Sequence, residues 1–465
     1  MHPITLPIAE LKSALSGLGK VINTRATLPL LHHLKVERTN DGWIALTGTD
    51  LDRFVTVRLE HPAEGSPVAV LVPYDQLQQS TKNCGKDERL VIEPTPEGPL
   101  IKFALAHNLG ASKVKPLPVQ EFPETPKIKH NPIPLPPEFR RAIHEAMDCA
   151  SKDETRYVLN GTFIDSGTYV VGTNGRILYS ANSFALPMND SIIIPSHKFL
   201  GWKEFNNDGE WQMRADKEFF QLSTRRWRFI SRHIEGQYPN WRQVVPDPKS
   251  FKTHLTIDPG KLEDIIKLIQ RLPCHDEKNR TLGLEWKNKQ FVLLAKADDE
   301  DPWLRVPVAD IKADGPENYI FLDRRYMLQV LQFGLNTISI IDSISPARFH
   351  NGHGKQMIVM PVRAEADASP PPPPVHQPEP PPPPKPIMIT TDTPVQPPPP
   401  SSGNKTPIEE AIDITLQFRD LFQNGLNLAR DLNAKLKSIN RMQRDSSKEF
   451  DALRSSLRSL QSFKL

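Results

Sequence analysis

The sequence predicts an α+β protein of three similar domains in tandem, each with two helices packed on antiparallel sheets, followed by a disordered proline-rich linker and a long C-terminal helix. The segment LTGTD at residues 46–50 recurs in outline as VVGTN at 170–174 and LAKAD at 294–298, with 124 residues from each copy to the next. A period of this length indicates a repeated domain rather than a solenoid repeat. Each copy opens with a helical apolar stripe, and the composition changes abruptly after Arg363. The predicted boundaries are 1–129, 130–250, 251–364, 365–405 and 406–465.

The opening helix of each copy is predicted from apolar residues at every third or fourth position. The stripes are Ile8, Leu11, Leu15, Leu18 and Ile22; Phe139, Ile143, Met147 and Ala150; and Leu262, Ile265, Ile269 and Leu272. In the third copy Asp258 is a predicted N-cap, and Pro259 suits the first helical position. We therefore expect one buried helix face at the start of each copy.

Strands and a second helix are expected to follow in each copy. Residues 43–47, 168–171 and 290–294 are rich in β-formers and bounded by turn residues. The second helices are predicted over about residues 74–84, 196–205 and 323–333, with Ser196 and Asp323 as N-caps. Antiparallel sheets with helices on one face are the expected result.

The last hundred residues have a different composition. Residues 369–400 are dominated by proline, which predicts an extended polyproline II spacer. Beyond it, apolar residues near heptad spacing predict a helical, coiled-coil-like tail that binds itself or a partner. These are Ala411, Ile414, Phe418, Leu421, Leu428 and Leu432, and then Phe450, Leu453, Leu457 and Leu460. A solubilising tail with a marginal helix is the alternative.

Charge and cysteine content exclude several classes. The net charge is +3, so a basic surface must be local if nucleic acid is bound. Three distant cysteines, Cys84, Cys149 and Cys274, argue against zinc and against a disulfide framework. We expect no signal peptide, no membrane span and a cytoplasmic, nucleoid-associated location.

Basic residues on the polar positions of the predicted helices suggest a lining for a phosphate backbone. They include Lys12, Lys20, Arg140, Arg141, Lys198, Lys203, Lys261, Lys267, Arg271, Arg324 and Arg325, with Glu145, Glu263 and Asp264 interleaved. An ordinary solvated helix face would show the same pattern. The threefold repetition favours the first interpretation, because equivalent faces would line one cavity.

Catalytic and metal-binding signatures are missing from the sequence. There is no G-x-S-x-G, P-loop, H-E-x-x-H or G-x-G-x-x-G motif. The pairs His32-His33 and His350-x-x-His353 lack a nearby cysteine or carboxylate partner, and the acidic run 298–301 is typical of a solvated loop. We therefore expect no catalytic residue, no metal and no cofactor.

Six stretches together carry a family resemblance: residues 25–31, 46–51, 156–161, 173–176, 235–245 and 360–363. In order and spacing, residues 1 to about 363 resemble the β sliding clamp of bacterial DNA polymerase III. The resemblance implies a head-to-tail homodimer, a ring of six clamp domains that encircles duplex DNA without reading its sequence. It also implies a non-catalytic processivity factor that tethers the polymerase III catalytic subunit and the clamp loader through linear peptides.

The resemblance also implies functional residues. The DNA contacts would be Arg25, Lys152 and Tyr157, joined by the helix cations Arg140, Arg141, Lys198, Lys203, Lys267 and Arg271. The partner-peptide groove would be lined by Leu159, Thr173, Gly175, Arg176, Leu178, Pro239, Val244, Tyr326, Ile358, Met360, Pro361, Val362 and Arg363. By analogy, Leu272 and Pro273 would contact the first domain of the second subunit.

The sequence departs from the family pattern at two positions, and two other functions are compatible with it. Gln243 stands where the family often has arginine, and Arg176 replaces a common histidine, so the peptide preference is not fixed by the resemblance. A clamp-fold paralogue that acts as a repair or recruitment scaffold through its tail is one rival. An enzyme acting on nucleic acid through the acidic run is the other.

Overall fold

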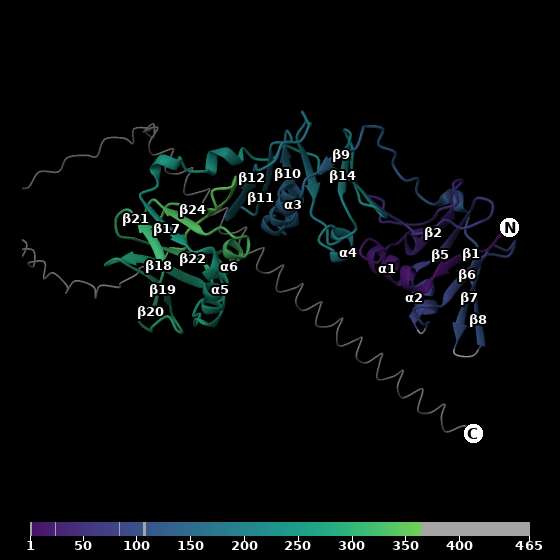
Figure 1. Ribbon diagram of the computed structural model, residues 1–465, viewed down its shortest axis with the longest axis horizontal. Coiled ribbons are helices and arrows are strands. Elements are labelled where there is room, and N and C mark those ends of the chain that lie inside the picture. Colours follow the sequence, from purple (N-terminus) through teal and green to yellow (C-terminus); the bar gives the residue numbers. More distant parts are fainter. Residues whose placement is uncertain (1, 24, 83, 106–107, 364–465) are drawn as a thin grey trace, which may run out of the picture. The chain divides into compact units, whose positions relative to one another are not determined.

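The computed structural model describes residues 2–363 except residues 24, 83 and 106–107 (Figure 1). The predicted linker (365–405) and tail (406–465) lie outside the described residues. Among the helices within the described range, none combines the length and hydropathy needed to span a bilayer.

Three groups of elements with nearly the same order follow one another; we call them the first, second and third repeat. The first contains β1 (Ile4–Pro7), α1 (Ile8–Leu18), β2 (His33–Arg38), β3 (Ile44–Thr49), β4 (Arg53–Arg58), β5 (Val68–Pro73), α2 (Tyr74–Lys82), β6 (Arg89–Glu93), β7 (Leu100–Leu105) and β8 (Asn108–Lys113). The second contains β9 (Ile133–Leu135), α3 (Pro137–Cys149), β10 (Gly161–Asp165), β11 (Tyr169–Thr173), β12 (Ile177–Ala181), β13 (Ile192–Pro195), α4 (Lys203–Asn206), β14 (Trp211–Ala215), β15 (Phe219–Ser223) and β16 (Trp227–Arg232). The third contains β17 (Thr253–Ile257), α5 (Leu262–Arg271), β18 (Thr281–Lys287), β19 (Gln290–Ala295), β20 (Leu304–Val308), β21 (Ile311–Asp314), β22 (Asn318–Asp323), α6 (Arg324–Gln332), β23 (Thr337–Ile340), β24 (Ala347–His350) and β25 (Lys355–Val359).

Each repeat has two four-stranded antiparallel arrangements. One has the order β5-β2-β3-β4 in the first repeat, β13-β10-β11-β12 in the second and β22-β18-β19-β20 in the third. The other runs β1-β6-β7-β8, β9-β14-β15-β16 and β17-β23-β24-β25, with β21 added beside β17. The identical connectivity shows that the chain repeats one fold three times.

The sequence alignment of the third copy is wrong by one residue. The inward-facing Leu46 and Val170 lie in the same hydrophobic core as Leu293, whereas Leu294 belongs to a separate cluster on the opposite face of β19. Successive side chains of a strand point to opposite faces, so a slip of one residue exchanges the two faces. The structural equivalent of Leu46 is therefore Leu293, not Leu294.

Neighbouring repeats share continuous sheets. Strand β4 pairs with β16, where Val57 lies opposite Trp227, and β12 pairs with β25, where Leu178 lies opposite Ile358. These pairs produce an eight-stranded and a nine-stranded sheet. The boundaries at 129/130 and 250/251 stay predictions, because hydrogen bonds cross the junctions between repeats.

The opening helices form where the apolar stripes predict them. Leu11, Leu15 and Leu18 of α1 are buried, as are Phe139 and Ile143 of α3. Ahead of α5, Asp258 accepts a hydrogen bond from the backbone N–H of Gly260 at 2.8 Å and begins a short 3₁₀ turn. At the start of α6 the carboxylate of Asp323 accepts from the N–H of Arg325, which confirms the predicted N-cap.

The second helix of the second repeat is much shorter than predicted. Only Lys203–Asn206 is helical, and the predicted cap Ser196 has a buried hydroxyl without a hydrogen-bond partner among the described residues. Phe199 and Trp202 both pack against Trp227, with ring centroids 5.5 and 5.1 Å apart. Burial of these rings, together with Gly201, outweighs the local helix preference of residues 196–202.

Candidate nucleic-acid and partner interfaces

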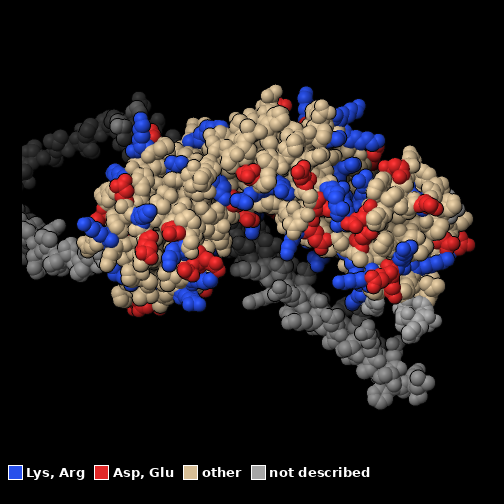
Figure 2. Space-filling model, in the orientation of Figure 1, with Lys and Arg blue, Asp and Glu red and all other residues tan. Residues whose placement is uncertain are grey.

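The predicted DNA-contacting cations lie on or beside the helices. Arg141 of α3, Lys203 of α4 and both Lys267 and Arg271 of α5 are exposed, and Arg140 is partly buried. Lys198 is exposed in the segment before α4. Figure 2 shows lysine and arginine interspersed with acidic side chains over the visible face of the described residues. Any attraction for phosphate is therefore local rather than a property of the whole surface.

One local positive region surrounds His197, at the start of the segment that precedes α4. Burial, followed by the charges of Arg53 and Lys198, lowers the pKa of His197 to about 4. The imidazole is thus neutral near pH 7; Arg53 is ion-paired with Asp50 at 2.9 Å, which leaves Lys198 as the exposed cation beside it. Such a region favours an anion such as a phosphate group.

The three residues transferred from the resemblance lie on connecting segments. Arg25 is exposed in the turn after α1, and Lys152 is exposed after α3. The side chain of Tyr157 is 58% exposed. Accessible cations and an exposed ring suit contact with a nucleic-acid backbone or an unpaired base.

Arg324 is not a surface cation, contrary to the helix-face prediction. It is 7% exposed, and its guanidinium donates hydrogen bonds to the carbonyl oxygens of Leu272 (2.6 Å) and Pro273. Burial lowers the pKa of Arg324. This contact fastens α6 to the end of α5, and it leaves Leu272 only 8% exposed within its own chain.

The residues predicted to bind partner peptides are brought together by the β12–β25 pair. The N–H of Met360 donates to the carbonyl of Arg176 at 2.9 Å, and the N–H of Val362 donates to the carbonyl of Phe321 at 2.7 Å. Nearby, the amide of Asn174 donates to the hydroxyl of Tyr326 at 3.2 Å. Among the predicted residues, Leu178 and Ile358 are buried; Leu159, Thr173, Tyr326, Pro361 and Val362 are partly buried; and Gly175, Arg176, Pro239, Val244, Met360 and Arg363 are exposed.

A satellite hydrophobic cluster supports this surface. Val171, Leu178 and Ile358 from the sheet pack with Tyr238 and Trp241 from the segment that leaves the second repeat. Asp165 holds that segment: its carboxylate accepts from the indole of Trp241 at 3.3 Å and forms a 2.7 Å ion pair with Arg242. Val244, next to Val245 of this cluster, and Met360, two residues after Ile358, remain 54% and 46% exposed. The result is an adaptable apolar surface with a rigid base.

Sequence reasoning missed Ile344, which is 76% exposed in the loop between β23 and β24. Ala347, three residues after Ile344, lies opposite Val359 in the β24–β25 pair, and Val359 immediately precedes Met360. Asp342 fixes the loop by accepting hydrogen bonds from the N–H groups of Ile344 and Ser345. No helical or strand pattern marks an isolated exposed isoleucine, so only the pairing reveals it.

Comparison with known proteins decides the fold. No family model matches the chain. The β sliding clamp of Pseudomonas aeruginosa is 24% identical over 383 residues, which cover 78% of this chain and 100% of that protein; the Salmonella typhimurium β sliding clamp is 23% identical, with coverages of 77% and 96%. The crystal structure of the P. aeruginosa DNA polymerase III subunit beta superposes with a TM-score of 0.66 at 24% identity, covering 78% and 100% of the two chains. The DNA polymerase sliding clamp of Bacillus subtilis gives a TM-score of 0.68 at 19% identity, with coverages of 78% and 99%. The chain has the sliding-clamp fold.

Among the sheet edges of the described chain, two belong to strands whose counterparts pair between repeats. Strand β20 is the third-repeat counterpart of β4 and β12, and β8 is the first-repeat counterpart of β16 and β25. Exposed apolar side chains mark both edges, since Leu109 is 84% and Leu304 is 47% exposed. Unpaired edges of this kind are templates for pairing with another chain.

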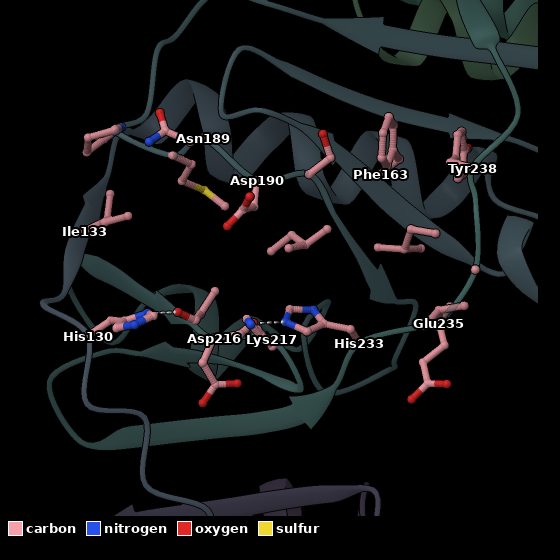
Figure 3. A pocket seen from close by; sticks show the side chains of 18 of the residues that line it. His130, Ile133, Phe163, Asn189, Asp190, Asp216, Lys217, His233, Glu235 and Tyr238 are labelled. Carbon is pink, nitrogen blue, oxygen red and sulfur yellow. Dashed lines mark hydrogen bonds between the residues drawn. The ribbon is translucent and has the colours of Figure 1, made fainter.

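A cavity of about 1100 Å³ lies in the second repeat of the clamp fold (Figure 3). Ile133, Met188 and Ile193 contribute apolar walls, and the ring of Phe163 stacks on that of Tyr238 with centroids 4.6 Å apart. His233 donates from Nε2 to the carbonyl of Asp216 at 2.9 Å, and burial lowers its pKa. The labelled polar side chains in Figure 3 are spread around the cavity.

A buried ion pair joins the second and third repeats of the clamp fold. The Glu145 carboxylate accepts from the ammonium of Lys355 at 2.7 Å and from the hydroxyl of Tyr179 at 2.6 Å. Lys355 also donates to the carbonyl of Phe333 at 2.8 Å. Burial, and then the charge of Glu145, raises the pKa of Tyr179, so its hydroxyl stays a donor.

Replacing Glu145 by glutamine should lower the free energy of unfolding by about 3 kcal/mol, because a nearly buried lysine loses its counter-charge. Urea unfolding followed by tryptophan fluorescence measures the change. The control is Glu263→Gln, which removes the exposed 2.9 Å ion pair with Lys267 and should leave the midpoint unchanged. Equal small shifts for both variants would show that the Glu145 pair does not secure the junction.

Proposed function

We propose that this chain is a DNA sliding clamp, a processivity factor that encircles duplex DNA and tethers a replicative polymerase to its template. The observation that carries the proposal is the pair of complementary free edges, β8 and β20. Each inner junction of the chain joins the fourth strand of one repeat to the last strand of the next. A second copy that used the same rule would close two chains into a ring of six repeats.

The inner junctions also give the register expected between two subunits. Val57 and Val306 are equivalent, because they lie opposite the inward-facing Leu46 and Leu293 in their hairpins. Leu6 and Leu135 are equivalent, because they lie just before α1 and α3. Crossing the paired strands β1-β6-β7-β8 from Leu6 leads to Gly110, and crossing β9-β14-β15-β16 from Leu135 leads to Trp227. Gly110 is therefore the equivalent of Trp227. Since Val57 lies opposite Trp227, Val306 should lie opposite Gly110, and Arg305 opposite Ala111.

This register explains a proline in β20. At the inner junction the N–H of Arg58 donates to the carbonyl of Arg226 at 2.9 Å, so Arg58 directs its backbone toward the neighbouring repeat. Its equivalent in β20 is Pro307, which has no N–H and is tolerated at an outward-facing edge position. The reciprocal hydrogen bonds at the subunit junction therefore depend on Arg305 and Ala111. The contacts inferred for Leu272 and Pro273 rest on the family resemblance alone, and Leu272 is only 8% exposed within its own chain.

The chemistry required of such a ring is modest. A closed ring held around DNA by topology needs only diffuse attraction to phosphates, which barely changes as the ring slides. Tethering raises the effective concentration of polymerase at the primer end without any catalytic group in the clamp. We propose a non-catalytic accessory subunit of the polymerase III type, located in the cytoplasm on the nucleoid. The polymerase and clamp loader would bind the surface around Leu178 and Met360.

Retention on plasmid DNA tests this function. Protein loaded onto a nicked circular plasmid should remain bound through gel filtration, and cutting the plasmid once should release it. Equal retention on circular and linear DNA would contradict sliding. A repair or recruitment scaffold is not favoured, because the relatives above match nearly their whole length with about the first three quarters of this chain.

Removing cations should flatten the salt dependence of DNA binding. Changing Arg141, Lys198 and Lys203 together to glutamine should reduce the slope of log affinity against log salt by about 0.9 for each lost phosphate contact. The control changes Lys289 and Lys312, in the β18–β19 turn and in β21, to glutamine. Measurements by fluorescence anisotropy with a labelled duplex should show an unchanged slope for that control. The same slope for both variants would remove these cations from the DNA surface.

A further inference from the structure

A small polar cavity adjoins the proposed peptide surface on the nine-stranded sheet. Its volume is about 320 Å³, and Ser180, Arg348, His350 and Gln356 are among its lining residues. None of the described residues that line it is acidic. Cations and amide donors without a carboxylate provide a site for an anion.

Strand pairing fixes where this cavity lies. In one row across the sheet, Ile358 lies opposite both Leu178 and Arg348. In the next row, two residues along each strand, Gln356 lies opposite both Ser180 and His350. Residues two apart on a strand are roughly 7 Å apart and share a face. The cavity therefore continues directly from the apolar floor formed by Leu178 and Ile358.

The guanidinium of Arg348 has unused hydrogen-bonding capacity. Its Nε is buried and has no hydrogen-bond partner among the described residues. Burial lowers the pKa of Arg348, and no neighbouring carboxylate opposes this effect. A buried donor without a partner is costly, and a bound carboxylate would satisfy it.

The other polar groups support an anion in the same place. Gln356 donates its amide to the hydroxyl of Ser180 at 3.1 Å, which orients both groups beside Arg348. Burial, and then the charges of Arg348 and His254, lowers the pKa of His350, so the imidazole adds no carboxylate-like charge to the cavity. Lys355 does not compete for the ligand, because its ammonium is engaged by Glu145 and the carbonyl of Phe333.

We propose that this cavity, centred on Arg348, is an acidic-residue subsite that binds an aspartate or glutamate next to the apolar anchor of a partner peptide. The inference rests on the proposed function, since it assumes that peptides bind over Leu178 and Ile358. It goes beyond that function by selecting partners whose anchor is flanked by an acid on one side. Arg348 provides the charge, and Gln356 orients the neighbouring hydroxyl.

Fluorescence anisotropy with four labelled decapeptides tests the subsite on the full-length chain. Each peptide carries a Leu-Leu-Phe anchor, with two aspartates or two asparagines placed before or after it. For one placement, the aspartate peptide should bind about 5- to 10-fold tighter than its asparagine counterpart. Arg348→Gln should reduce that ratio to about 1 while leaving the affinity of the asparagine peptide unchanged, and Arg348→Lys should retain part of it.

The control is Arg232→Gln, which changes an exposed arginine of β16 that is ion-paired with Glu218 and should preserve the ratio. Equal affinity of aspartate and asparagine peptides, or equal weakening of both by Arg348→Gln, would overturn the subsite alone. If oligothymidylate competes with the peptides and this competition depends on Arg348, the cavity binds nucleic acid, and the acidic-residue subsite is again overturned. Failure of all four peptides to bind would overturn the proposed peptide surface as well.

Discussion

Changing both Ala111 and Arg305 to proline should convert the dimer to monomer, with an association constant at least about 100-fold lower. In the proposed register these two residues exchange the reciprocal backbone hydrogen bonds of β8 and β20. Each proline removes one N–H that points toward the partner, and none that pairs with β7 or β19. Because a ring contains this junction twice, both closures are lost. Sedimentation equilibrium at micromolar concentration measures the change.

The matched control changes the same two residues to threonine, which keeps both N–H groups and favours the strand conformation. That variant should remain dimeric. Both variants lose the ion pair between Arg305 and the buried carboxylate of Glu285, so each should fold but unfold at a lower thermal midpoint than the unchanged protein. Loss of dimer in the threonine variant would assign the effect to side chains rather than to the backbone ladder. A dimer that survives both prolines would refute the β8–β20 pairing.

Changing Val244 and Met360 together to alanine should weaken polymerase binding roughly tenfold or more. Both side chains are about half exposed and follow or precede residues of the cluster that contains Leu178 and Ile358, so a partner side chain can reach them. Their removal takes away contact area without opening the protein core. Primer extension on a long single-stranded template by the replicative polymerase should show shorter products at limiting polymerase.

Leu28→Ala is the control for this pair, because Leu28 is 52% exposed and lies in the first repeat, ahead of β2. It should leave product length unchanged, and neither variant should alter retention on circular DNA. Shortened products together with lost retention would mean that the ring, rather than the partner surface, had failed.

Local patterns predicted the elements whose stability is local. The stripes of α1, α3 and α5 and the cap at Asp323 follow from side-chain spacing and backbone capping, which depend on near neighbours in the chain. The part of the predicted helix at residues 196–202 does not form, because its conformation is set by a distant contact. Phe199 and Trp202 are fixed by Trp227, some 25 residues away, and such a tertiary contact overrides local propensity.

The candidate site is assembled by pairing of strands that lie far apart in the sequence, and the register of that pairing cannot be read from local sequence patterns. The resemblance pointed to Leu178, Ile358 and Met360, and the β12–β25 pair brings them together. It gave no sign of Arg348, whose role emerges only when β24 and β25 place it beside Ile358. Arg324 had the composition of a surface cation, yet its hydrogen bonds to Leu272 and Pro273 bury it. The third repeat was misaligned by one residue because composition alone does not reveal which face of β19 is inward.

The central claim is that two chains close head to tail through β8 and β20 around DNA, and a covalent closure tests it most directly. Leu109→Cys and Pro307→Cys, which should lie opposite each other across the junction, are introduced with Cys274→Ser so that the exposed native thiol is removed. After loading on a circular plasmid and treatment with a short bismaleimide, we expect a doubly linked dimer that stays on the circle in detergent and leaves when the plasmid is cut. Absence of the crosslinked dimer, or its loss from the intact circle in detergent, would contradict a ring closed through β8 and β20.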